Sequence, residues 1–256
     1  MKKFYLIAAA AAVFMLSGCT LLKWGGPDAS IKPEPVADDV FKQGEELLAK
    51  GKYEEARKKY SSVKEKDPER YYDALVQVRL GDSYYEEARY AEAEVEYRRF
   101  LELHPKNKAA PYVMYQLGMS NFKQMDLPDR DPEFAANAQY HFSELLKAYP
   151  DNPYKDEARE KLRLAKARVA EHELVVGNYY YKRGAYKASA KRYRYILDSY
   201  PQSYNEPEVM YKLVDSHIRL GEFDKAKEAL AVLYHEYPTH GYSDMAKNNL
   251  APRIPQ

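Results

Sequence analysis

The sequence predicts an all-α fold in which one motif is repeated five times, and three observations support this prediction. First, a small residue, an aromatic ring and a proline recur in the same order between residues 38 and 240. Second, glycines stand where one helix of such a motif would turn into the next. Third, residues 154–176 contain neither proline nor glycine, which favours one long helix.

The chain begins with a segment, residues 1–18, that is typical of a secretory signal peptide. Lys2 and Lys3 precede thirteen residues without a charge. This apolar run is too short to span a bilayer core of about 30 Å, which takes roughly 20 residues. Such a segment is removed from the mature protein and takes no part in the fold.

The residues around the only cysteine, Leu16-Ser17-Gly18-Cys19, resemble the bacterial lipobox. The resemblance implies cleavage between Gly18 and Cys19, with diacylglycerol and an N-acyl lipid on Cys19 and no other cofactor. Two or more acyl chains give stable membrane anchoring. The next residue is Thr20 rather than aspartate, which in the lipoprotein sorting pattern implies the periplasmic face of the outer membrane. The alternative is an ordinary signal peptide with a chance cysteine.

Residues 19–37 are predicted to form a lipidated, flexible tether. They contain Gly25, Gly26, Pro27, Pro33 and Pro35. A mostly polyproline-like segment of this length reaches about 55 Å. Asp38 or Asp39 is then expected to cap the first helix.

The repeated motif starts at a small anchor residue. An aromatic ring follows nine positions later, a second large apolar residue 16 positions later and a proline 24 positions later. In the third repeat the proline follows after 32 positions, so eight residues are inserted, around residues 125–130. The five anchors are Gly44, Gly81, Gly118, Gly177 and Val214.

This motif resembles the tetratricopeptide repeat, which implies a solenoid of five antiparallel helix pairs. In such a pair the anchor lies where the two helices approach most closely, and the proline ends the second helix. Rings at the Tyr53 and Tyr60 positions are expected to fill the space to the next pair. The residues Asp131-Pro132-Glu133 predict the start of the second helix of repeat three, with Asp131 as its cap.

One spacing differs from the others and divides the repeats into two groups. The proline of one repeat usually stands 13 positions before the next anchor, but 27 positions before Gly177. The difference adds about 21 Å of helix, so a long helix is predicted to open the fourth repeat. We expect repeats one to three at residues 38–151 and repeats four and five at residues 152–240. Residues 241–256 form a tail without an assigned role.

Composition and motifs argue against several classes of function. The 40 basic and 39 acidic residues leave a net charge of +1, whereas nucleic-acid-binding proteins usually have a basic excess. The chain contains no nucleophile elbow, P-loop or dinucleotide-binding motif. Its six histidines lack the spacing of a metal site. We therefore expect no enzymatic activity, no metal and no nucleic-acid partner.

A basic segment in the fourth repeat is the candidate for partner binding. Lys187, Lys191 and Arg194 follow the spacing i, i+4, i+7, which places them on one helix face, and Arg192 lies beside them. No acidic residue occurs between residue 182 and Asp198. Such a run is typical of a solvated helix face, and the alternative is a docking surface for an acidic protein.

Over nearly its whole length, the chain resembles the BamD family, the tetratricopeptide-repeat lipoproteins of the outer-membrane β-barrel assembly machinery. The most specific segments are Tyr112-Val113-Met114-Tyr115 with Gly118, Asp129-Arg130-Asp131-Pro132, Arg183-Gly184-Ala185, Lys191-Arg192 and Tyr200-Pro201. The resemblance implies a non-enzymatic scaffold that helps to insert and fold β-barrel proteins. Its implied partners are the periplasmic domains of BamA, other lipoproteins of the machinery and unfolded barrel substrates. Arg192 matches a family arginine at the BamA contact.

The alternative is another tetratricopeptide lipoprotein, such as a pilotin for secretin or pilus assembly. A pilotin would share the lipid anchor and the repeats but would lack the segment 129–132 and the long helix. Recovery of BamA or of a secretin with the mature protein distinguishes the two.

Overall fold

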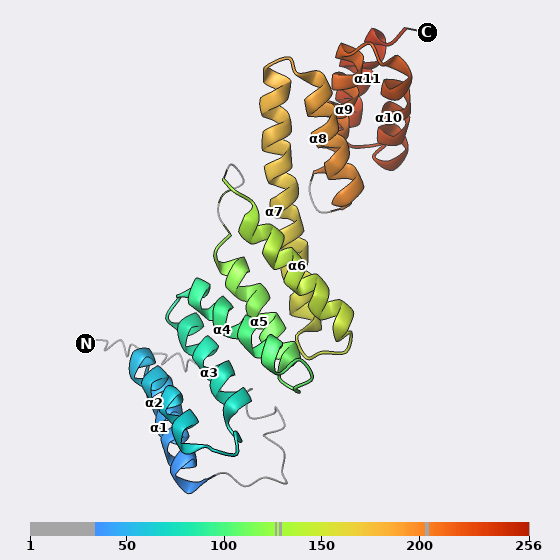
Figure 1. Cartoon of the computed structure of the whole chain (residues 1–256). Coiled ribbons are helices and arrows are strands. Elements are labelled where there is room, and N and C mark those ends of the chain that lie inside the picture. Colours follow the sequence, from blue (N-terminus) through green and yellow to red (C-terminus); the bar gives the residue numbers. More distant parts are fainter. Residues whose placement is uncertain (1–33, 126, 128–129, 203–204, 256) are drawn as a thin grey trace, which may run out of the picture. The chain divides into compact units, whose positions relative to one another are not determined.

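The computed structural model describes residues 34–125, 127, 130–202 and 205–255 (Figure 1). Gly18, Cys19, the signal peptide and most of the tether lie outside these residues, as does part of the insert. The lipid anchor and its cleavage site therefore stay predictions.

All regular structure in the described residues is helical, which confirms the predicted all-α fold. Within that part of the chain, none of the helices combines the length and the apolar character that crossing a membrane requires. The elements are α1 (Pro35–Ala49), α2 (Tyr53–Lys66), α3 (Asp73–Glu86), α4 (Tyr90–Leu103), α5 (Ala110–Lys123), α6 (Glu133–Ala148), α7 (Lys155–Lys182), α8 (Tyr186–Ser199), α9 (Glu206–Arg219), α10 (Phe223–Glu236), α11 (Gly241–Asn249) and the short 3-10 helix η2 (Ala251–Arg253).

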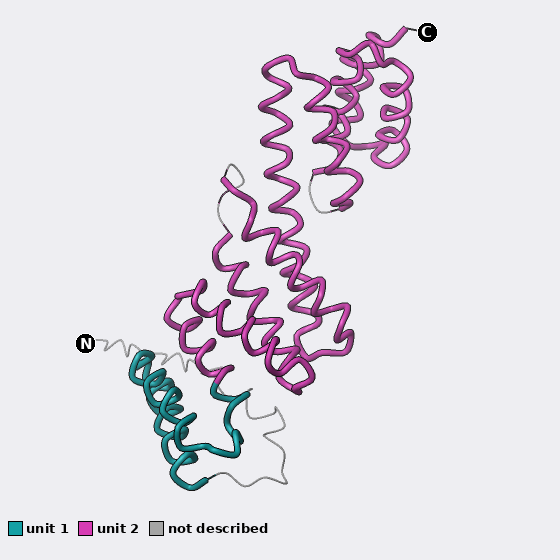
Figure 2. The backbone as a smooth tube through the Cα atoms, in the orientation of Figure 1, with its two compact units in different colours: residues 1–76 teal, residues 77–256 magenta. Residues whose placement is uncertain are grey.

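The chain divides into two compact units between Val76 and Gln77 (Figure 2). In the second unit each helix from α4 to α10 packs against the next one along the chain. This order is that of stacked helix pairs, in which every pair contacts only its neighbours. The grouping of the repeats into residues 38–151 and 152–240 stays a prediction.

The second helix of every pair ends two residues before its proline, as the motif predicts. The proline ring clashes with a helical conformation at the residue before it, so that residue takes a more extended one and the helix stops. The ends are Lys66 before Pro68, Leu103 before Pro105, Ala148 before Pro150, Ser199 before Pro201 and Glu236 before Pro238.

The first helix starts earlier than predicted, because α1 begins at Pro35 and neither Asp38 nor Asp39 caps it. Proline suits the first helical position, since its φ is already helical and its missing N–H is not needed there. The last residues of the predicted tether thus belong to a helix, and Ala37 is buried. Asp38 lies in the first turn, where its carboxylate accepts a hydrogen bond from the Tyr72 hydroxyl at 2.6 Å.

The second helix of repeat three begins one residue later than predicted. α6 starts at Glu133, and Pro132 is its N-cap. The Asp131 carboxylate accepts a hydrogen bond from the backbone N–H of Glu133 at 3.0 Å. The aspartate therefore stabilises the helix start from one position further out than a cap.

Each anchor glycine lies against a ring on the second helix of its own pair. A Cβ atom at Gly44 would lie 2.6 Å from Tyr60, and one at Gly81 would lie 2.5 Å from Tyr97. A larger anchor would overlap the ring, which is why the motif needs a small residue there. The rings at the Tyr60 position therefore fill the space between the two helices of one pair. The sequence pattern had predicted them between successive pairs.

The insert leaves this packing unchanged. In repeat three the ring is Phe142, which follows Gly118 by 24 positions instead of 16. A Cβ atom at Gly118 would lie 2.6 Å from the Phe142 ring. The eight inserted residues therefore lengthen the connection between the helices and preserve their contact.

The residue directly after the anchor is a hydrogen-bond acceptor where the ring that packs on the anchor is a tyrosine. In three repeats a tyrosine hydroxyl donates to this residue: Tyr60 to Glu45 at 2.6 Å, Tyr97 to Asp82 at 2.8 Å and Tyr193 to Asn178 at 2.9 Å. Repeat three has Met119 at this position and a phenylalanine ring, Phe142. Neither a buried acceptor nor a buried hydroxyl is then left without a partner. This pairing accounts for some of the 26 tyrosines, which far outnumber the 8 phenylalanines of the chain.

The turns inside the pairs use a left-handed backbone seven positions after the anchor. Gly51, Gly184 and Gly221 adopt φ values of 70°, 73° and 72° there, which confirms the predicted turn glycines. Ala88 takes the same position in repeat two with a φ of 59°. A Cβ atom makes this conformation unfavourable.

Replacing Ala88 by glycine is therefore expected to raise the free energy of unfolding by about 0.5–1 kcal/mol, since relief of the left-handed strain exceeds the entropy cost of glycine. Urea unfolding followed by circular dichroism measures the change. The control is Ala231→Gly at an exposed position in the middle of α10, which should lower stability by about 1 kcal/mol. A loss of similar size in both variants would contradict the expected strain at Ala88.

The predicted long helix is confirmed as α7, which has 28 residues. Its first half contributes Ala158 and Ala165 to a core that it shares with α5 and α6. Its second half contributes Ala170 and Leu174 to a core built mainly from α8 to α11. The helix therefore contributes residues to two separate cores.

The tail forms a structured end of the repeat array. α11 packs on α9 and α10, and Ala246 and Leu250 are buried in the same core as those helices. The Ser243 hydroxyl donates to the backbone carbonyl of Tyr237 at 2.6 Å. Solenoids need a terminal element that covers the last apolar face, and α11 has this role here.

Candidate partner-binding surface

Helix α8 has an exposed basic face and a buried apolar face. Lys187, Lys191 and Arg194 are all exposed, while Tyr193 and Ile196 are completely buried on the opposite side. The shared face predicted from the i, i+4, i+7 spacing is thus confirmed. None of the three cations forms an ion pair with a described residue. We call these three residues the basic face.

Arg192 lies beside the basic face and is paired inside the protein. Its Nη1 atom donates to both carboxylate oxygens of Glu173 on α7, at 3.0 and 2.7 Å. The Arg192 side chain is 42% exposed and that of Glu173 is 12% exposed. Arg192 on α8 therefore reaches the surface with its guanidinium held by Glu173 of α7.

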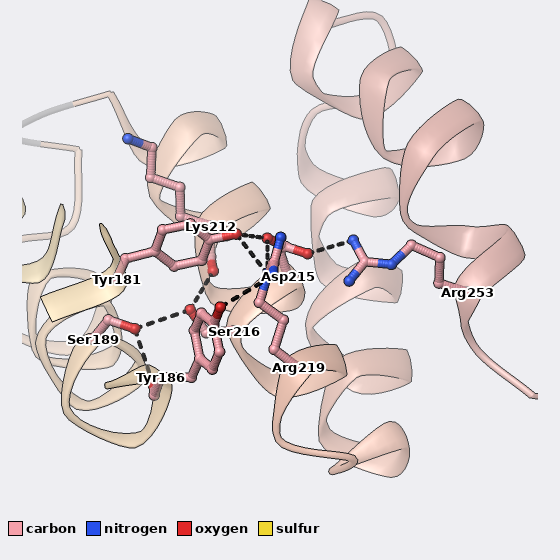
Figure 3. A network of polar contacts seen from close by, with 8 residues as sticks. All are labelled: Tyr181, Tyr186, Ser189, Lys212, Asp215, Ser216, Arg219 and Arg253. Carbon is pink, nitrogen blue, oxygen red and sulfur yellow. Dashed lines mark hydrogen bonds and ion pairs between the residues drawn. The ribbon is translucent and has the colours of Figure 1, made fainter. Parts of the chain in front are cut away.

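Asp215 on α9 is the centre of the polar network that holds this part of the chain together (Figure 3). Its carboxylate accepts hydrogen bonds from the Tyr181 hydroxyl, from Arg219 Nε at 3.1 Å and from Arg253 Nη1 at 2.6 Å. The Asp215 side chain is only 10% exposed. A buried carboxylate is stable only with such partners, because an unpaired charge is costly to remove from water.

Arg219 connects three helices of this network. Its guanidinium lies 5.4 Å from the Tyr181 ring of α7 and 5.1 Å from the Tyr186 ring of α8, within the range of a cation–π interaction. Its Nη1 atom also donates to the Tyr186 hydroxyl at 3.1 Å. The hydrogen bond to Asp215 raises the pKa of Arg219 above its ordinary value, because it favours the charged form of the guanidinium.

Two further contacts fix α9 against α8 and α7. The hydroxyl oxygens of Ser189 on α8 and Ser216 on α9 lie 3.2 Å apart, and both side chains are buried. Lys212 of α9 donates to the side-chain carbonyl of Asn178 on α7 at 2.9 Å. The basic face of α8 is therefore presented on a rigid support.

Sequence reasoning missed Glu173, Asp215 and Arg253. Asp215 had a detectable signal, because it follows the anchor Val214 as Asp82 follows Gly81. Glu173 and Arg253 had none, since their partners lie on other helices. Among the described residues, no group of three histidine, cysteine, aspartate or glutamate side chains could hold a metal ion.

Stacked helix pairs in which a small anchor packs against a ring of the second helix define a tetratricopeptide-repeat protein. A family model described as "YfiO: Outer membrane lipoprotein" matches residues 33–233. The chain therefore belongs to the YfiO family of outer membrane lipoproteins.

Relatives with known names agree with this assignment. "Outer membrane protein assembly factor BamD" of Vibrio cholerae is 25% identical over 232 residues, which cover 87% of this chain and 94% of that protein. The protein of the same name from Rickettsia prowazekii is 30% identical over 97 residues, which cover 38% of this chain and 39% of that protein. In Caulobacter vibrioides the identity is 25% over 138 residues, with 52% and 45% covered. The chain thus spans less than half the length of the last two relatives.

Solved structures with a similar arrangement are tetratricopeptide-repeat proteins. The complex of the TPR2AB domain of yeast Sti1 with pHSP90 matches with a TM-score of 0.42 and 14% identity, covering 86% of this chain and 84% of that chain. YrrB, a TPR protein with an unusual peptide-binding site, matches with a TM-score of 0.38 and 17% identity, covering 82% and 90%.

Proposed function

We propose that this protein is a periplasmic scaffold, anchored to the outer membrane by lipid, that binds BamA and helps to insert and fold β-barrel proteins. Membership of the YfiO family and the relatives named BamD support this role. The observation that carries the contact with BamA is the basic face of α8, three exposed cations without an ion pair to any described residue. No observation favours a pilotin.

The basic face fits a partner surface that is rich in carboxylates. Unpaired cations on a rigid helix attract an acidic surface, speed its association and orient it. We place the periplasmic domains of BamA on repeats four and five for this reason. Unfolded barrel substrates are placed on repeats one to three, and other lipoproteins of the machinery are further partners, as the family resemblance implies.

Reversing the basic face is the test of this contact. The triple variant Lys187→Glu, Lys191→Glu, Arg194→Glu is expected to bind purified BamA periplasmic domains about tenfold more weakly or worse at low salt, because like charges now face each other. Its helicity should be unchanged, since all three positions are exposed. Isothermal titration calorimetry at two salt concentrations measures the affinity.

The matched control for this experiment changes the same amount of charge elsewhere. Lys106→Glu, Lys108→Glu, Lys147→Glu replaces three exposed lysines outside α8 and should leave the affinity for BamA nearly unchanged. Equal weakening in both triple variants would show a general effect of net charge and would remove the basic face from the proposed contact.

The lipid anchor is proposed at Cys19, the only cysteine in the chain. Cys19→Ala is expected to give an unlipidated protein, because no other thiol can accept the diacylglycerol. Metabolic labelling with a fatty acid and flotation of envelopes measure the result. A Cys19→Ala protein that is still labelled and still floats with membranes would rule out the lipobox.

A further inference from the structure

We propose that Glu173 is a positioning residue that holds the Arg192 guanidinium ready for a carboxylate of the partner. This inference rests on the proposed contact between repeats four and five and an acidic surface of BamA. It adds a residue that makes no contact with the partner itself and acts through Arg192.

The hydrogen bonds between the two side chains leave half of the guanidinium free. Both oxygens of Glu173 accept from the same nitrogen, Nη1 of Arg192. The Nε and Nη2 atoms of Arg192 form no hydrogen bond to a described residue. These two atoms make up one edge of the planar group, and such an edge binds a carboxylate by two parallel hydrogen bonds.

Helix α8 lies close to α7 where Arg192 leaves it. A Cβ atom at Gly177 would lie 3.4 Å from Cβ of Arg192, so α8 approaches α7 closely at this anchor glycine. Glu173 stands four residues before Gly177, one helical turn away on the same face of α7. The arginine side chain therefore starts close to Gly177 and reaches Glu173, one turn away along α7, where its guanidinium is held by two hydrogen bonds.

The surroundings explain why this fixation matters for binding. The Glu173 side chain is nearly buried, and its backbone belongs to the second half of the 28-residue helix α7. Lys191 and Arg194 are the charged neighbours of Arg192 along α8, and both repel a free guanidinium. Without Glu173 the arginine would adopt many rotamers, and a partner would have to order it on binding.

A competing role for Glu173 predicts the opposite result. If the partner had to remove Arg192 from Glu173, loss of this glutamate would strengthen binding. The free Nε–Nη2 edge favours the positioning role, because a partner carboxylate can reach it while Nη1 stays bound to Glu173.

The test is a double-mutant cycle on the full mature chain with purified BamA periplasmic domains as the probe. Glu173→Ala is expected to weaken binding about three- to tenfold, the effect of ordering one flexible side chain. The same change in an Arg192→Ala background should leave the affinity unchanged. Glu173→Gln, which keeps an acceptor for Nη1, should retain most of the affinity and serves as the variant with the least effect on folding. Glu171→Gln, one turn from Arg168 on the same helix, is the control and should bind as the unaltered protein does.

The outcomes separate this inference from the proposed function. Equal weakening by Glu173→Ala with and without Arg192 would show a structural role and overturn the inference. Stronger binding, or no change while Arg192→Ala weakens binding, would overturn it too and leave the proposed contact standing. If Arg192→Ala itself has no effect, Arg192 is outside the contact, and the inference fails while the basic face is judged by its own triple variant.

Discussion

Gly177→Val is expected to destabilise the protein by about 3 kcal/mol, the upper end of the usual cost of overpacking. Even a single Cβ atom at Gly177 would lie 2.7 Å from the Tyr193 ring, and valine adds two methyl groups. The ring cannot move away, because it is completely buried and its hydroxyl donates to Asn178. Thermal and urea unfolding followed by circular dichroism measure the loss.

A second substitution is expected to restore part of that stability. In repeat five the anchor is Val214, and Leu230 stands 16 positions later, where Tyr193 stands in repeat four. Both residues are buried in the core of the C-terminal helices. Adding Tyr193→Leu to Gly177→Val reproduces this natural combination, so the double variant should be more stable than the sum of the two single changes predicts.

The control for the glycine variant is Gly241→Val at the start of α11. No heavy atom lies within 4 Å of a Cβ atom built at Gly241, so this change should shift stability by less than about 0.5 kcal/mol. A similar loss at Gly177 and Gly241, or simple additivity in the double variant, would contradict the contact between anchor and ring.

Asp215→Ala is expected to lower the free energy of unfolding by about 2–3 kcal/mol. Removing one member of a fully buried ion pair typically costs about 3–5 kcal/mol. The cost is smaller here because the side chains of Arg219 and Arg253 are 39% and 41% exposed and can regain water. Urea unfolding measures the loss. The substitution also removes the ion pair that joins Arg253 of the tail to α9.

Two further variants test whether Asp215 acts through the tail. Arg253→Ala should reproduce part of the loss in the unaltered chain and cause little further loss in an Asp215→Ala background. Asp244→Ala, at an exposed aspartate of α11 with a weak 3.5 Å pair to Lys247, should change stability by less than about 0.5 kcal/mol. If Asp215→Ala is as mild as Asp244→Ala, the network in Figure 3 does not stabilise the fold.

Helix ends and tight contacts could be predicted well because they depend on local chemistry or on a repeated spacing. A proline stops a helix through its own ring, and an anchor glycine recurs wherever the next helix passes close by. The long α7 followed from counting residues between Pro150 and Gly177. One error concerned the start of the first helix, where Pro35 rather than Asp38 determines the first turn. The other concerned the rings at the Tyr60 position, which pack against the anchor inside their own helix pair.

The all-α fold, the five repeats and the shared side of the three cations on α8 were thus contained in the order of the residues. The partners of the charged side chains were not. Arg192 and Glu173 stand 19 positions apart on different helices, and Asp215 is joined to Arg253 over 38 positions. Only the packing of α7, α8, α9 and the tail brings these groups within hydrogen-bonding distance, because an ion pair depends on distance in space and no periodic pattern records it.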